Sequence, residues 1–161
     1  MREYNVMGNN VTVANQPVSL VAIMPASGQT IEILRMWVSQ AANATSAQQR
    51  IAWGFKATAY QTVTSVAPQA LKSSDPASLI VGATTIAAGK SGINASAEGG
   101  GALTIVGADD FNVLNGWLWV PTPRETIMIN SASSFAFTFQ FPAAPSTLTN
   151  WSFGVTFAEL G

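Results

Sequence analysis

The residues that could perform acid–base or metal chemistry are few in this sequence. The chain of 161 residues has eight Asp and Glu residues, no His and no Cys. Asp109-Asp110 is the only adjacent carboxylate pair. Such a pair can hold a calcium ion with nearby carbonyl groups, but a calcium site usually needs further acidic groups at set spacing, and none follow. Because Asp is favoured in turns, we interpret the pair as a turn before a strand that starts at Phe111.

Nucleophilic catalysis and phosphate binding also lack their usual residues. The glycines at 99–101 are not followed by the Lys-Ser/Thr of a phosphate-binding loop. A nucleophilic Ser would need a base, and without His only Lys could serve, yet no Ser-x-x-Lys motif occurs. Glycoside hydrolysis needs only two carboxylates, but the acidic residues are dispersed over the chain. We therefore expect no enzymatic activity, no catalytic residue, and no metal or cofactor.

The tryptophans offer a different chemistry, because indole rings stack on sugars and also fill protein interfaces. There are five of them: Trp37, Trp53, Trp117, Trp119 and Trp151. A carbohydrate-binding groove is one interpretation, and we favour the other, in which they lie in the core or in a subunit interface. In a regular strand Trp117 and Trp119 share one face and Leu118 points the opposite way. We therefore expect this strand to be covered on both sides.

The clearest elements that could position these residues lie in the last third of the chain. Bulky residues fall on every second position in two stretches, 135–141 and 151–157, with mostly small or polar residues between them. Successive side chains of a strand point to opposite faces, so each stretch predicts a half-buried antiparallel strand. The first stretch is uncharged and free of Pro, which would make it aggregate at a sheet edge. We expect it to be a central strand or to be covered by a neighbouring subunit.

Shorter segments of similar character precede these two stretches. The expected strands are 2–14 with a turn at 8–10, 17–24, 30–40, 50–60, 77–85, 103–107, 111–120 and 125–130, and a flexible loop is expected at 91–102. The pattern predicts an all-β fold, an antiparallel β-sandwich of about eight strands that is jelly-roll-like. We expect a single domain over residues 1–161.

The composition bears on what surrounds this domain. Apolar residues make up 48% of the chain and charged residues only 9%, with a net charge of −1. Soluble monomers normally carry more surface charge. A surface of Ser, Thr, Asn, Gln and Ala loses its water at low cost. We favour burial of this surface against other copies or a partner, and a stable but weakly charged sandwich is the alternative.

Nucleic-acid and membrane binding are not expected. Phosphate contacts need clustered Lys or Arg, and the seven basic residues are scattered. Two long stretches carry no charge, 4–31 and 126–158, but polar residues, Gly and Pro interrupt both, which argues against a transmembrane helix. The N-terminal residues lack the apolar core of a signal peptide, so we expect assembly in the cytoplasm.

Four groups of short motifs resemble those of small phage and prophage virion proteins. They are Tyr4-Asn5-Val6 followed by Val11-Thr12-Val13; Ile31-Glu32-Ile33 leading to Ser39-Gln40; Asp110-Phe111-Asn112-Val113 followed by Gly116-Trp117 and Val120-Pro121-Thr122-Pro123-Arg124-Glu125; and the ending Phe157-Ala158-Glu159-Leu160-Gly161. Together they span most of the chain. The functional class that the chain most resembles is the head decoration, or cement, protein of tailed phages. The chain is longer and more aromatic than lambda-type decoration proteins.

The resemblance implies a function, a location and partners. Decoration proteins are β-rich, often trimeric, and clamp neighbouring major capsid subunits on the outside of the expanded shell. The resemblance therefore implies a capsid-stabilising protein, assembled in the host cytoplasm, whose partners are the major capsid protein and two further copies of itself. A tail or baseplate component, a head-fibre component and a carbohydrate-binding jelly-roll module are the alternatives.

The N-terminal segment is our candidate for the contact with the capsid or a neighbouring subunit. Its residues Arg2, Glu3, Tyr4 and Asn5 are polar or aromatic, and we interpret residues 1–8 as an extended arm. A frayed terminus is the alternative.

Overall fold

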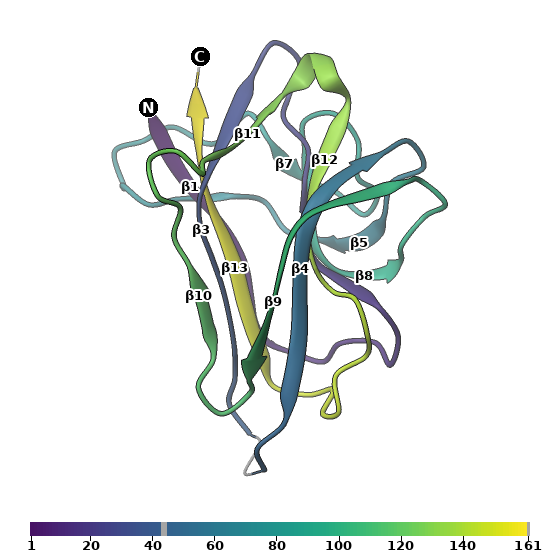
Figure 1. Ribbon diagram of the computed structural model, residues 1–161. Coiled ribbons are helices and arrows are strands. Elements are labelled where there is room, and N and C mark those ends of the chain that lie inside the picture. Colours follow the sequence, from purple (N-terminus) through teal and green to yellow (C-terminus); the bar gives the residue numbers. More distant parts are fainter. Residues whose placement is uncertain (43–44, 161) are drawn as a thin grey trace.

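The computed structural model describes residues 1–42 and 45–160, which form two β-sheets packed face to face (Figure 1). The strands are β1 (Arg2–Val11), β2 (Val18–Ile23), β3 (Thr30–Gln40), β4 (Gln48–Ala57), β5 (Thr62–Ser65), β6 (Gln69–Ala70), β7 (Val81–Gly82), β8 (Lys90–Ala97), β9 (Leu103–Asn112), β10 (Trp117–Trp119), β11 (Ile127–Asn130), β12 (Phe135–Phe141) and β13 (Trp151–Leu160). Within the described residues, the one helical element is a 3₁₀ turn at Ser131–Ser133. The same residues contain no helix with the length and apolar character needed to cross a membrane.

The strand order joins segments that are far apart in the sequence. Sheet A has the order β10-β3-β13-β1-β6, and β11 also pairs with β3. Sheet B has the order β5-β8-β2-β12-β4-β9, and β7 pairs with β8. Every pairing is antiparallel except the short one between β7 and β8. The expected all-β antiparallel sandwich is confirmed, with the two termini side by side at one end (Figure 1).

The two aromatic stretches occupy the centres of the two sheets. Strand β12 lies between β2 and β4, and β13 lies between β1 and β3. Their inward side chains meet in the core, where these are fully buried: Phe137, Phe139, Phe141, Trp151, Phe153 and Phe157. Removing a large aromatic side chain from water contributes about 1.5–3 kcal/mol. The expectation that 135–141 is a central strand is therefore confirmed.

The outer face of β12 is buried as well, which the alternation did not predict. Gln61 donates hydrogen bonds from Nε2 to Thr138 Oγ1 (2.9 Å) and to Ser19 Oγ (3.1 Å). Glu98 accepts hydrogen bonds from the hydroxyl and the amide of Ser19. The segments that carry Gln61 and Glu98 therefore cover this face of sheet B and satisfy its hydroxyl groups.

Several expected boundaries are wrong. Residues 91–102 were expected to form a loop, but most of them belong to β8, which pairs with β2 and β5. The expected strand at 111–120 is divided by a turn between β9 and β10. Only β7 forms within the expected strand 77–85. Leu118 is 63% exposed, so β10 is covered on one side only in the described part of the chain.

Candidate interaction surfaces

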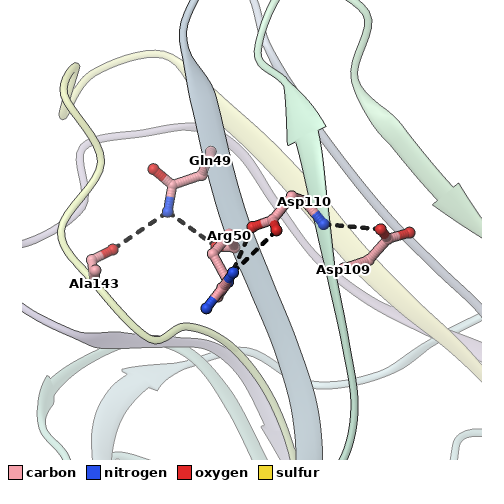
Figure 2. Close-up of polar contacts among 5 residues, drawn as sticks. All are labelled: Gln49, Arg50, Asp109, Asp110 and Ala143. Atoms are coloured by element: carbon pink, nitrogen blue, oxygen red, sulfur yellow. Dashed lines mark hydrogen bonds and ion pairs between the residues drawn. The ribbon is translucent and has the colours of Figure 1, made fainter.

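Asp109 and Asp110 lie in the edge strand β9 and not in a turn. Arg50, on β4, donates hydrogen bonds from Nε to Asp110 Oδ1 (3.0 Å) and from Nη2 to Oδ2 (3.1 Å) (Figure 2). The hydrogen bond from Arg50 lowers the pKa of Asp110, and the same contact raises the pKa of Arg50. The side chains are 64% and 53% exposed, so solvent screens the pair and its contribution to stability is small.

Asp109 has a different role, since it links the two sheets. Its carboxylate accepts hydrogen bonds from the Asp110 amide (2.8 Å; Figure 2) and from Trp117 Nε1 (2.9 Å) on β10. On the adjacent strand β4, Gln49 Nε2 donates to the Ala143 carbonyl, which attaches the turn after β12 to β4 (Figure 2). In the described ranges, no group of three or more His, Cys, Asp or Glu side chains could hold a metal ion. The two carboxylates therefore hold neighbouring side chains in place: Asp110 binds Arg50, and Asp109 fixes the indole of Trp117.

The tryptophans divide between the core and the surface. Trp151 is fully buried and Trp53 nearly so, whereas Trp37, Trp117 and Trp119 are partly exposed. Trp53 lies 5.4 Å from Trp117 and 5.9 Å from Trp119 between ring centroids. This cluster lies on the side of the sandwich where β9 of sheet B faces β10 of sheet A.

A cleft opens beside this cluster. It has a volume of about 280 Å³ and is lined by Trp53, Val106, Trp119, Glu125 and Ile127. We call it the Trp53–Trp119 cleft. Two indole rings and one carboxylate line this cleft.

A second surface crosses the outer face of sheet A. Successive cross-strand pairs join Met7 to Gly154, Gly154 to Trp37 and Trp37 to Leu118. We call these four residues the apolar row. A Cβ atom added to Gly154 would come within 2.8 Å of Trp37 Nε1, so the indole rests directly on the backbone of β13. Met7 and Leu118, at the two ends of the row, are 44% and 63% exposed.

The N-terminal candidate residues lie in strand β1 of sheet A and do not form a separate arm. Residues of β1 pair with β13, with Arg2 opposite Glu159 and Asn5 opposite Thr156. Tyr4 is fully buried, and its hydroxyl donates a hydrogen bond to the Pro76 carbonyl. In this conformation Tyr4 has no surface to offer a partner. A capsid contact through the more accessible Arg2, Glu3 and Asn5 stays a prediction.

The sequence analysis predicted neither the Trp53–Trp119 cleft nor the apolar row, although it contained one sign of the latter. The opposite orientation of Leu118 and its two tryptophan neighbours was visible in the alternation. The apolar row was not, because its residues come from four strands whose register the sequence does not give. Comparison of the chain with protein-family models, with curated proteins and with solved structures finds no match in any of the three.

Proposed function

We propose that this chain is a head decoration protein of a tailed phage, which binds the outer capsid surface as a trimer and clamps neighbouring major capsid subunits. The observation that carries the proposal is the apolar row, because it exposes Met7 and Leu118 on a sheet face in a chain with only 9% charged residues. Contiguous exposed apolar surface is typical of protein contact sites. The resemblance of the short motifs to phage virion proteins supports the same class.

The strand order supports a jelly-roll form of the sandwich. We count β10 and β11 as one broken strand, since both pair with β3, and treat the segment from β5 to β8 as an insertion. The principal strands then follow the order β10/β11-β3-β13-β1 in sheet A and β2-β12-β4-β9 in sheet B. Two interlocked Greek keys produce this order, and jelly rolls occur in viral capsid and lectin domains. A fold alone does not decide between these functions.

The clamping mechanism follows from multivalency. A copy that contacts two capsid subunits needs only weak individual contacts, because the second contact forms at a high effective concentration. Trimerisation extends the same gain to three copies. Few charges have to be stripped of water when such a surface is covered, so the low charge favours close packing.

The test is a mass measurement of the purified protein, alone and with capsids of the phage that encodes it. We expect a trimer in sedimentation equilibrium and co-sedimentation with expanded capsids, with unexpanded shells as the control. A monomer that stays in the supernatant with both kinds of shell would contradict the proposal. Localisation by electron cryomicroscopy to the tail or baseplate would replace it with the tail-component alternative.

A carbohydrate-binding module is the second candidate, and the Trp53–Trp119 cleft is the observation that favours it. Sugars stack on partly exposed indole rings such as that of Trp119, and carboxylates such as Glu125 accept hydrogen bonds from sugar hydroxyl groups. Quenching of tryptophan fluorescence by soluble oligosaccharides, without any association with capsids, is the result expected for this candidate.

A further inference from the structure

Asn115 and Gly116 form the one Asn-Gly pair of the sequence. They lie in the turn between β9 and β10. Gly116 has a φ of +68°, a left-handed backbone conformation that glycine adopts without strain. The turn therefore favours a residue without a Cβ atom directly after Asn115, and the backbone nitrogen of that residue has no side chain of its own to shield it.

The side chain of Asn115 is exposed and is not held in place by a hydrogen bond within the described ranges. Asn112, in the same turn, shows the contrast. Its Nδ2 donates to Ser46 Oγ (2.6 Å), and its Oδ1 accepts from the Leu114 amide (3.0 Å). The amide group of Asn115 is therefore free to turn toward the next peptide bond, whereas that of Asn112 is restrained on both sides.

The backbone amide of Gly116 is not held by the sheet either. Pairing of β10 with β3 begins one residue later, with Trp117 opposite Val38. On the other side, the Asn115 amide donates to the Asn112 carbonyl (3.0 Å). Between these two points, no hydrogen bond in the described part of the chain fixes the Gly116 nitrogen. A nucleophile has to approach its target to about 3–3.5 Å, and this unrestrained link permits that approach.

We propose that Asn115 is a site of spontaneous deamidation in which Gly116 provides the nucleophile. The Gly116 amide loses its proton to solvent base, and its nitrogen attacks Cγ of Asn115 to close a succinimide ring. The bond from Cγ to Nδ2 breaks, and Nδ2 takes a proton and leaves as ammonia. A water molecule then opens the ring at either carbonyl, which produces Asp or isoaspartate at this position. The reaction needs no reactant other than water.

Both products place a negative charge beside the apolar row. Asn115 and Gly116 line a surface hollow of about 490 Å³ together with Trp37 and Leu118, two residues of that row. Isoaspartate also lengthens the main chain just before β10, the strand that carries Leu118. Covering a carboxylate that has no cationic partner costs free energy. Deamidation therefore weakens association through the row, a consequence that rests on the proposed function.

The first experiment follows the chemistry on the full chain in mildly alkaline buffer. Peptide mapping by mass spectrometry locates the mass increase of amide-to-acid conversion, and fragmentation distinguishes isoaspartate from Asp. We expect position 115 to convert first, at a rate that rises with pH because the attacking nitrogen must lose its proton. Asn112 is the internal control and is expected to stay intact. Asn115→Gln is expected to suppress conversion at this position, because Gln would have to form a larger ring.

Two results of this experiment would overturn the assignment. One is conversion of another Asn before Asn115. The other is an intact Asn115 after a time in which the free peptide acetyl-Leu-Asn-Gly-Trp-amide has converted completely, because the folded turn would then prevent the attack.

The second experiment tests the consequence with Asn115→Asp, which carries the charge of one product. Asn15→Asp is the matched control, because Asn15 is exposed between β1 and β2, outside the row. In sedimentation with expanded capsids, Asn115→Asp is expected to weaken association about tenfold and Asn15→Asp to leave it unchanged. Equal association of the two variants would overturn the consequence. Wild-type protein that does not bind capsids would overturn it together with the proposed function, whereas the peptide map decides the deamidation itself without any capsid.

Discussion

Leu118 provides the most direct test of the apolar row. It is 63% exposed at one end of the row, so about two thirds of its side chain remains for a partner to cover. Complete burial of a Leu side chain contributes about 1.5–3 kcal/mol. The exposed fraction therefore supplies about 1–2 kcal/mol per copy, and Leu118→Ser is expected to weaken association by a factor of about 5–30. Folding stability is expected to change by less than about 0.5 kcal/mol, because the site is on the surface.

The assay is sedimentation of wild type and variant over a concentration series, alone and with expanded capsids. Leu79→Ser is the matched control, because Leu79 is 60% exposed but lies between β6 and β7, outside the row. Both variants remove nearly the same exposed apolar surface, so general solubility effects cancel. Equal association constants for the two variants, or no change in either, would refute the assignment of the row as a contact surface.

Two further predictions concern stability. Gly101→Ala is expected to lower the free energy of unfolding in urea by about 1–3 kcal/mol, because the added Cβ would collide with the Thr58 carbonyl oxygen. Gly100→Ala is the control and is expected to leave stability unchanged, because no atom lies within 4 Å of its added Cβ. Asp110→Asn is expected to remove the small stabilisation that the ion pair with Arg50 gives the wild-type protein. That stabilisation is fully present above the ordinary carboxyl pKa of 3.8, and it is lost as the pH falls through the lower pKa that Asp110 has beside Arg50. Urea midpoints of the two proteins should therefore differ slightly at pH 7 and converge in acid; a gap that widens in acid would contradict the sign.

The sequence predicted the sandwich because its central strands carry large apolar residues at a period of two. Phe137 and Phe139 alternate with Ala136 and Thr138, and this alternation requires a strand whatever its neighbours are. The alternation does not predict that the second face of β12 is also buried. Thr138 is buried because Gln61, far away in the sequence, folds over it, and no local pattern contains that contact.

The missed strand β8 and the misassigned acidic pair have physical explanations of their own. Ser91 and Gly92 have low strand propensity, but β2 and β5 pair with β8 from both sides, so tertiary pairing decides its conformation. Asp109 and Asp110 are polar enough for a turn, yet an edge strand tolerates them because one side of it faces solvent. Turn and edge-strand preferences overlap for such residues.

Strand β10 contributes to both candidate surfaces, which explains why neither could be read from the sequence. It has three residues, pairs with β3 alone in the described chain, and turns Leu118 outward into the apolar row. Its two tryptophans face the other way, where Trp119 lines the cleft and Trp117 is held by Asp109 of β9. A partner that covers Leu118 restricts the same short strand that shapes the cleft.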